Sequence, residues 1–130
     1  MDLEMFMAGK AETVQDVDYV ASTRFKDADG NPIPWKLRAL SCDKESDIKK
    51  MCMKGTTFDT LKYAEMLTVE TIAEPELGNA ALQDSYKVVG KLALLNKMLT
   101  SGEKNALMLK AQAVNGLNVS MNDLIDDAKN

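Results

Sequence analysis

The side chains in this chain that could do chemistry are two cysteines, several serines and many carboxylates, because its 130 residues include no histidine. Histidine is the commonest general base and metal ligand, so a nucleophile here would need another group to activate it. Cys42 and Cys52 have no second cysteine pair beside them, which favours neither a zinc site nor a disulfide framework. We therefore expect free thiols, no catalytic residue and no cofactor, and we predict that the protein is not an enzyme.

An alternation of acidic and amide residues resembles a calcium loop only in part. Asp27, Asp29 and Asn31 match the first three oxygen ligands of such a loop. Pro32 stands where the sixth-position glycine is required, and Arg38 stands where the bidentate glutamate is required, so a turn is the better interpretation. A second acidic group suits a helix start and solvent rather than an ion: Asp123, Asp126 and Asp127. We assign no metal.

Nine methionines are the most unusual feature of the composition. The flexible thioether of methionine suits surfaces that must fit varied apolar partners, but it also fills irregular gaps in cores. Core filling is the better interpretation for three methionines on apolar helix faces: Met66, Met98 and Met108. The candidates for a partner-binding surface are Met1, Met5, Phe6, Met7 and Met53.

The charge of the chain argues against nucleic acid as a partner. The formal net charge is −4, whereas phosphate binding is driven by clustered lysine and arginine. The densest basic group, Lys49, Lys50 and Lys54, alternates with acidic residues as on a solvated helix face. Asp2 and Glu4 stand where a signal peptide needs basic residues, and the apolar run there is too short to span a membrane. We expect an intracellular protein without a membrane partner.

The clearest structural element is a β-hairpin that holds the only tryptophan. Apolar residues alternate with polar ones over Val17–Phe25 and again over Ile33–Ala39. Between these runs, Asp27–Pro32 supplies residues that tolerate positive φ or bond their own backbone, so the chain can reverse there. Trp35 lies on the apolar side of the second run, and we expect it to be at least half buried against helices.

Capping residues and apolar residues at three-and-four spacing predict helices over the rest of the chain. Gly55 is expected to end the first helix, and Pro75 prevents continuation of the second. That second helix is apolar nearly all round, so it should be central and the most buried. The predicted helices run from Ser41 or Asp43 to about Lys54, from Asp59 or Thr60 to about Ala73, from Ala80 to about Tyr86, from Lys91 to Leu99, from Thr100 to about Val114, and from Ser120 to Ala128.

We therefore predict an α+β fold in one domain covering residues 1–130. A small N-terminal antiparallel β-hairpin or sheet, over 14–40, precedes a C-terminal array of four to six helices over 41–130. Residues 1–13 form a weakly amphipathic start, which we expect to be mobile in isolation. The chain is 45% hydrophobic, and a domain of this length buries about two thirds of its unfolded surface, which is enough for one core.

The hairpin also carries a family resemblance. The block Arg24-Phe-Lys-Asp-x-x-Gly-Asn-Pro-x-x-Trp-Lys-x-Arg38 resembles the N-terminal hairpin of the XkdN-like tail assembly chaperones of Gram-positive phages and prophages. Lys104 departs from the pattern, which has an aromatic there, and Met1–Met7 belongs to no part of it. The likeness covers most of the chain, since further pieces agree in order: Phe58-Asp59, Lys62-Tyr63, Pro75-x-Leu77, Leu82 to Tyr86, Leu94-Leu95, Met98-Leu99, Gly102-Glu103 and Asn115-Gly116.

This resemblance implies a non-catalytic phage or prophage tail assembly chaperone in the host bacterial cytoplasm. Its expected partner is the tape measure protein, whose long apolar helices it would keep soluble, and the tail tube protein is a further candidate. Two alternatives stay open: a structural tail component that remains in the virion, and a small metal-independent enzyme. The sequence leaves the oligomeric state open, with a homo-oligomer among the alternatives.

Overall fold

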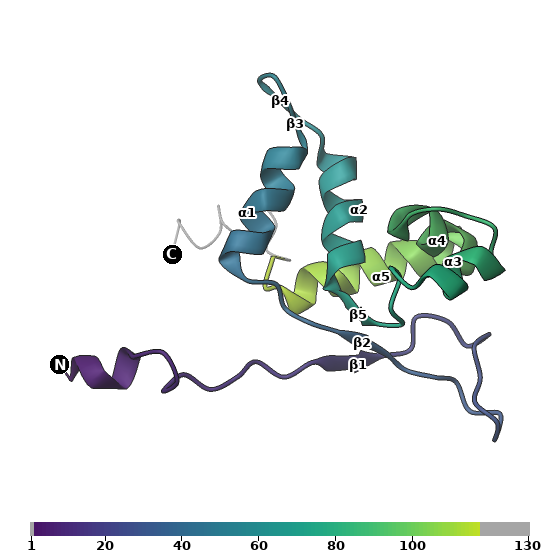
Figure 1. Cartoon of the computed structure of the whole chain (residues 1–130), viewed down its shortest axis with the longest axis horizontal. Coiled ribbons are helices and arrows are strands. Elements are labelled where there is room, and N and C mark those ends of the chain that lie inside the picture. The colour runs from purple at the N-terminus through teal and green to yellow at the C-terminus, as the bar shows by residue number, and fades with distance from the viewer. Residues whose placement is uncertain (1, 118–130) are drawn as a thin grey trace, which may run out of the picture.

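The computed structural model describes residues 2–117 as a small antiparallel sheet with helices on one side of it (Figure 1). The first strand follows a short 3-10 helix, η1, at Leu3–Phe6. The strands of the main sheet and of a separate small hairpin are β1 Val17–Tyr19, β2 Trp35–Leu37, β3 Met53–Lys54, β4 Thr57–Phe58 and β5 Ile72–Glu74. The helices are α1 Cys42–Met51, α2 Thr60–Thr71, α3 Ala80–Ser85, α4 Lys91–Met98 and α5 Ser101–Val114. The predicted α+β class is confirmed.

The main sheet has the strand order β1-β2-β5, and both neighbouring pairs are antiparallel. Tyr19 pairs with Trp35 and Asp18 pairs with Lys36 across the first two strands. Because side chains alternate along a strand, Trp35 and Leu37 share the inner face and both are buried, Trp35 at 3% exposure. Lys36 and Asp18 share the outer face, where they form an ion pair of 2.9 Å. The expected burial of Trp35 is confirmed.

The hairpin strands are shorter than the sequence predicts. Only Val17–Tyr19 of the alternating run Val17–Phe25 forms a strand, and beyond it a single bridge joins Lys26 to Pro32. The side chain of Ser22 accepts a hydrogen bond from the backbone N–H of Arg24 at 3.1 Å, and this local bond replaces the strand ladder. The chain between β1 and the turn is therefore a loop over the helices.

The predicted turn at Asp27–Pro32 is confirmed. The Asp27 carboxylate accepts backbone N–H bonds from Asp29 and Asn31, both at 2.9 Å, and the backbone N–H of Asp27 itself donates to the Asn31 carbonyl at 2.9 Å. The Asp27 carboxylate, which resembled the first calcium ligand in the sequence, thus stabilises a chain reversal.

The core lies between the inner face of the sheet and helices α2, α4 and α5, which Figure 1 shows above the strands. Leucine dominates it, as expected for helices that present one apolar face. The largest contiguous cluster of buried apolar side chains consists of Ala21, Trp35, Leu37, Val69, Ile72, Leu77, Leu94, Leu95, Met98, Leu99 and Leu107. Met98 is core filling, as expected, whereas Met66 and Met108 are half-buried.

Helix α2 ends two residues earlier than predicted, and the residues after it form the third strand of the sheet. Asp59 caps its start by accepting the backbone N–H of Lys62 at 3.0 Å, as expected. At its end, Ile72–Glu74 turns into β5 and pairs with β2. Pro75 disfavours helical backbone in the residue before it, so an extended segment there is favoured. Among the described helices, α2 has the most buried residues, as expected, although Leu61 in its first turn is exposed.

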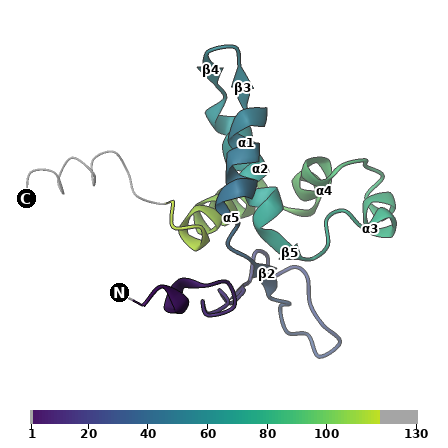
Figure 2. The ribbon, with the colours of Figure 1, turned by 60° about the vertical axis from the view of Figure 1, so that its left-hand side comes forward.

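Helix α1 also ends earlier than predicted, and the prediction that Gly55 terminates it is wrong. The helix stops at Met51, and the segment that follows forms the hairpin of β3 and β4, in which Met53 pairs with Phe58. Gly55 occupies the turn of this hairpin at φ +61°, a conformation that glycine adopts without steric cost. The hairpin projects from the far ends of α1 and α2 (Figures 1 and 2).

The remaining helices begin where the sequence places them. Asn79 caps α3 through the backbone N–H of Leu82, and Gly90 precedes α4. The predicted capping box at the start of α5 is present, with Thr100 and Glu103 each accepting a hydrogen bond from the backbone of the other. The helix predicted over Ser120 to Ala128 lies outside the described residues.

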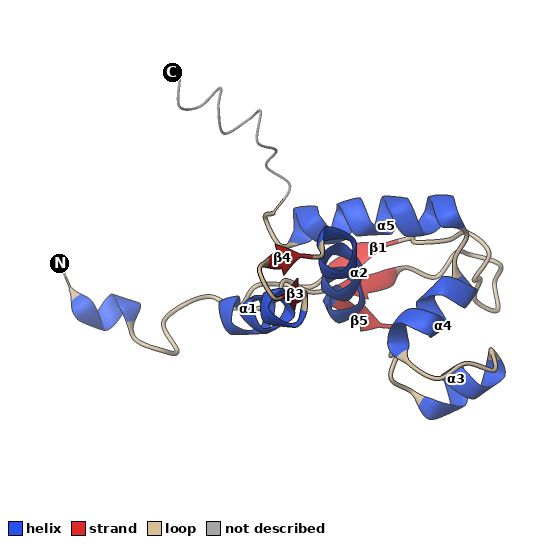
Figure 3. Ribbon diagram, turned by 90° about the horizontal axis from the view of Figure 1, so that it is seen from above, coloured by secondary structure: helices blue, strands red, loops and turns tan. Residues whose placement is uncertain are grey.

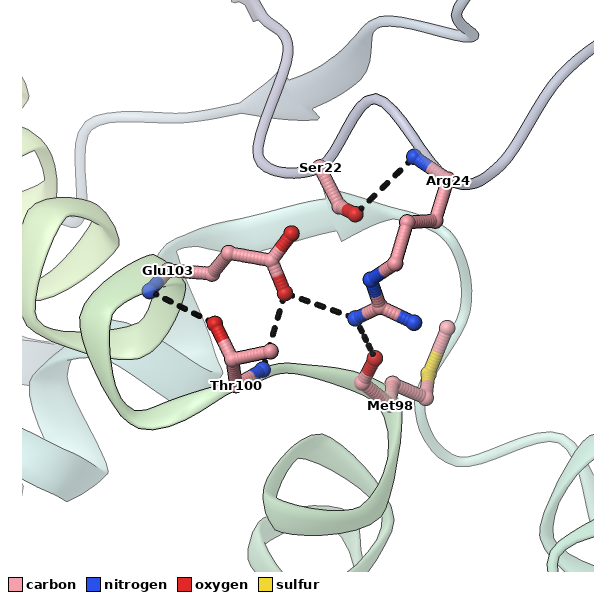
Figure 4. A network of polar contacts seen from close by, with 5 residues as sticks. All are labelled: Ser22, Arg24, Met98, Thr100 and Glu103. Carbon is pink, nitrogen blue, oxygen red and sulfur yellow. Dashed lines mark hydrogen bonds and ion pairs between the residues drawn. The ribbon is translucent and has the colours of Figure 1, made fainter.

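One side chain fastens the loop after β1 to the helical part. The Arg24 guanidinium donates from Nη2 to the backbone carbonyl of Met98 at 2.8 Å and to Glu103 Oε1 at 2.6 Å (Figure 4). The same Glu103 oxygen accepts the backbone N–H of Thr100 at 2.8 Å. The Arg24 guanidinium thereby donates hydrogen bonds both to a carbonyl at the end of α4 and to a carboxylate in the first turn of α5.

The charge of Glu103 is stabilised by this arrangement. Hydrogen bonds from Arg24, then from Ser22 and the Thr100 backbone, lower the pKa of Glu103 from 4.5 to about 2. Because the folded chain holds the ionised form more strongly than the unfolded chain does, the contribution to stability is complete above pH 4.5. It is lost as the pH falls from 4.5 towards about 2.

Trp35→Ala tests the packing of the sheet on the helices. Removing a fully buried aromatic side chain should lower the free energy of unfolding by about 3–5 kcal/mol. Urea denaturation followed by far-UV circular dichroism measures the change without the tryptophan signal. Val89→Ala, at a position that is 92% exposed, is the control and should change stability by less than about 0.5 kcal/mol. A loss below about 1 kcal/mol for Trp35→Ala would contradict the packing described here.

Glu103→Gln tests the ion pair with Arg24. Glutamine can keep the capping box but carries no charge, so the variant should melt at a lower temperature than the wild type at neutral pH. The difference should shrink as the pH falls from 4.5 to about 2, because the wild-type carboxylate becomes protonated there. Thermal melts of both proteins across this range measure it. A difference that stays constant with pH would show that the ion pair is not its cause.

Candidate functional site

An apolar groove of about 340 Å³ is open on the surface of the described residues. It lies where the loop before β2, the segment after β5 and helices α3 and α4 meet, so segments far apart in the sequence contribute to it. We call it the groove. Its lining residues are Phe25, Ile33, Pro34, Trp35, Glu74, Pro75, Leu82, Tyr86 and Met98.

Aromatic side chains from the hairpin build one wall of the groove. The rings of Phe25 and Trp35 lie 6.4 Å apart between centroids at an interplanar angle of 52°. The Arg24 guanidinium lies over the Phe25 ring at 5.4 Å from its centroid, while its hydrogen bond to Glu103 fixes it. This wall therefore depends on the ion pair that joins the loop to α5.

The rim of the groove is open to solvent and almost free of charge. Ile33 is 43% exposed, and Leu82 and Tyr86 from α3 are half-buried. Glu74 is the one charged residue among the lining side chains. A surface of this kind suits apolar side chains of a partner, with the carboxylate able to accept one basic group beside them.

The N-terminal arm, residues 2–16, carries most of the partner-binding residues proposed from the sequence. Met5, Phe6 and Met7 lie in or directly after the single 3-10 turn η1 and are 57–70% exposed. Figure 3 shows this arm extending away from the helices. Met1 lies outside the described residues. The structure thus brings three of the five candidates together without burying them.

Met53, the fifth candidate, lies elsewhere. It is exposed in the hairpin β3–β4, here called the tip, where it stands opposite Phe58. The base of the tip is fixed by Tyr63, whose hydroxyl donates to Glu45 on α1. Burial, followed by this hydrogen bond, raises the pKa of Tyr63. The tip and the end of the arm lie well apart in two views (Figures 1 and 2).

The thiols lie at opposite ends of one helix. Cys42 is exposed at the start of α1 and Cys52 is buried at its end. A helix rises about 1.5 Å per residue, so the two are about 15 Å apart, too far for a disulfide between them. Among the described residues, no group of three or more His, Cys, Asp or Glu side chains could hold a metal ion.

Three Ser-x-x-Lys tetrapeptides, a spacing used by some acyl-transfer enzymes, begin at Ser41, Ser46 and Ser101. In such a site the lysine ammonium must reach the serine hydroxyl. Here each lysine instead pairs with a carboxylate: Lys44 with Glu70, Lys49 with Glu45, and Lys104 with Glu65. Ser41 accepts the backbone N–H of Lys44 as a helix cap. In all three tetrapeptides the lysine is therefore held by a carboxylate rather than by the serine hydroxyl.

The groove is not visible in the sequence. Its residues come from four separate segments, and no spacing pattern joins Phe25 to Leu82 or Tyr86. A partial signal existed, since Trp35 and the segment from Leu82 to Tyr86 both lie in the family resemblance.

Among the described residues, no helix is long and apolar enough to span a membrane.

Comparison with known proteins identifies relatives over almost the whole chain. The phage-like element PBSX protein XkdN of Bacillus subtilis (strain 168) is 27% identical over 142 aligned residues, which cover 99% of this chain and 94% of that protein. The uncharacterized protein YqbN of the same strain is also 27% identical, over 99% of this chain and 93% of its own length. The crystal structure of protein YqbN superposes with a TM-score of 0.82 at 27% identity, covering 89% of this chain and 97% of that one.

The family itself follows from a match over nearly the full length. Residues 3–129 match the family described as phage XkdN-like tail assembly chaperone protein, TAC. The match contains the hairpin, the groove and the tip, and it agrees with the fold similarity. This chain therefore belongs to the XkdN-like phage tail assembly chaperone family.

Proposed function

We propose that this chain is a non-catalytic chaperone that binds the tape measure protein of a phage or prophage tail during its assembly in the host bacterial cytoplasm. Its family membership supports a role in tail assembly. A long unassembled tape measure exposes apolar helical stripes that tend to aggregate. A protein that covers these stripes reversibly keeps the tape measure soluble until the tail tube subunits gather around it.

The observation that carries this proposal is the groove. Its lining is apolar apart from Glu74, and Trp35 and Met98 beneath it belong to the core, so the surface is held in place before a partner arrives. An apolar helix that binds such a groove inserts side chains spaced three and four residues apart. A volume of about 340 Å³ fits the side chains of one or two helical turns.

The charges around the groove favour a particular kind of stripe. Glu74 lies at the groove opposite Lys36 of β2, but Lys36 makes its ion pair with Asp18, and Glu74 makes none with a described residue. A lysine or arginine that flanks the apolar residues of the partner helix can pair with it. Such a pair on an exposed rim adds less to affinity than the apolar anchors, but it selects the orientation of the helix.

Co-expression with the cognate tape measure protein tests the proposal. The soluble yield of the tape measure should rise, and size-exclusion chromatography should show a complex with several copies of this chain. Ile33→Asp should weaken that complex by about tenfold or more, because a charge then enters the apolar groove. The melting temperature of the isolated Ile33→Asp variant should change little, since Ile33 is 43% exposed.

Val89→Asp is the matched control, because it makes the same kind of change at an exposed position that does not line the groove. It should bind the tape measure as the wild type does. If the tape measure is equally soluble without this chain and no complex forms, the proposal is wrong.

The main alternative is a structural tail component that stays in the virion. Mass spectrometry of purified particles distinguishes the two roles. An assembly chaperone should be absent from finished tails, while the tape measure and tail tube proteins should be present. Recovery of this chain in fixed proportion to the tube protein would favour the structural role.

A further inference from the structure

The loop between β1 and β2 contains a unit, residues 23–34, that is bonded mainly to itself. Among the described residues, none of its backbone groups bonds to the backbone outside it. We call this unit the finger, and it projects beyond the sheet in two views (Figures 1 and 2). Its own backbone hydrogen bonds run from the N–H of Asp27 to Asn31, from that of Gly30 to Asp27 and from that of Ile33 to Phe25.

Two side chains hold the finger against the rest of the protein. Phe25 is its one half-buried residue, and the Phe25 ring packs on Trp35 with the ring centroids 6.4 Å apart. Arg24 donates to the Met98 carbonyl at 2.8 Å and to Glu103 at 2.6 Å. We call these two hydrogen bonds of Arg24 the latch. No strand ladder supports the finger, so its position depends on the ring contact and the latch.

The chain is fixed in the core at both ends of the finger. Ser22 and Trp35, which flank it, are each 3% exposed. Every residue between them other than Phe25 is exposed. A unit that is bonded internally, anchored at its two ends and held by two side chains can swing as one body, with the backbone at its ends as the hinge.

The position of the finger sets the width of the groove. The groove residues that the finger supplies are Phe25, Ile33 and Pro34, and those that α3 supplies are Leu82 and Tyr86. The remaining lining residues belong to β2, to the chain around the end of β5 and to α4, so they stay in place when the finger moves.

We propose that the finger closes on an apolar helix bound in the groove, and that Arg24 is the latch residue that keeps it closed. Arg24 does not line the groove, so it is a positioning residue that acts through Phe25, whose ring centroid lies 5.4 Å from its guanidinium. The Arg24 side chain is 51% exposed, and an exposed ion pair contributes little to stability, so the latch opens readily. Such a latch suits a protein that must release its partner. This inference rests on the proposed function, because it concerns the same groove.

Trp35 reports the position of the finger in the free chain, because it is the only tryptophan and it contacts Phe25. Arg24→Gln should raise the rate constant for acrylamide quenching of Trp35 by about threefold. Arg24→Lys keeps the charge and can donate to one of the two acceptors, so it should lie between the wild type and Arg24→Gln. Far-UV circular dichroism should stay unchanged in both variants.

A control and a second measurement separate a swinging finger from an unfolding one. Lys49→Gln removes an ion pair of α1, which supplies no residue to the groove, and should quench as the wild type does. Hydrogen exchange of Arg24→Gln, followed by NMR, should not become faster at the amides of Asp27, Gly30 and Ile33. These amides keep their hydrogen bonds when the finger moves as one body.

Dissociation from the immobilised tape measure protein tests the latch in the complex. Arg24→Gln should dissociate about threefold faster than the wild type, with an unchanged association rate. A variant that only lost folded protein would instead associate more slowly and dissociate at the wild-type rate. Glu103→Gln should also dissociate faster, and combining it with Arg24→Gln should add little, because both changes open the same latch.

Three results would overturn the inference: unchanged quenching of Trp35 in Arg24→Gln, an unchanged dissociation rate, or faster exchange throughout the finger. The same rates measured with a synthetic peptide helix, in which leucine recurs at three-and-four spacing, distinguish this inference from the proposed function. If the wild type binds the peptide but not the tape measure, the proposed function is wrong and the peptide decides whether Arg24 is the latch. If the wild type binds neither, both proposals are wrong.

Discussion

Arg24 attaches a long loop to the junction between two helices, and the position of the groove wall depends on this attachment. The strands β1 and β2 pair over only three residues each, so backbone hydrogen bonds alone hold little of the segment between them. Arg24 satisfies the Met98 carbonyl and the Glu103 carboxylate together, and Glu103 in turn caps α5. A charge-assisted bond to a capping residue thus aligns the sheet, α4 and α5 at one point. The wall of the groove, where Phe25 contacts Trp35, follows directly after this residue.

From this attachment the chain can be understood as a body with two extensions. The body contains the core and the groove, which we propose holds an apolar stripe of the tape measure. The arm and the tip lie outside it, and both expose apolar side chains.

Local signals in the sequence predicted most of the helices. A capping side chain bonds a backbone N–H only three residues further on, so the residue types that form a cap can be recognised in the sequence. Asp59, Asn79 and Thr100 with Glu103 all begin helices as expected. The strand β5 was missed because its pairing partner is distant in the sequence: Ile72 looks like a helix continuation until β2 lies beside it. The hairpin after α1 is local, and it was missed because Gly55 was interpreted as the end of the helix rather than as the turn between two short strands. The groove was missed because its lining residues come from segments that only the fold brings together. Met5, Phe6 and Met7 are exposed in the arm, which agrees with their selection as surface residues. Their role as partner contacts stays a prediction.

The central claim is that the groove holds an apolar helix of the tape measure protein. Hydrogen exchange of this chain, measured by mass spectrometry with and without the tape measure, tests it most directly. We predict slower exchange at the segments around Ile33, at the residues following Glu74 and over α3, with little change on the outer face of α5. Slower exchange confined to α5, or no change at any segment in a formed complex, would contradict the account.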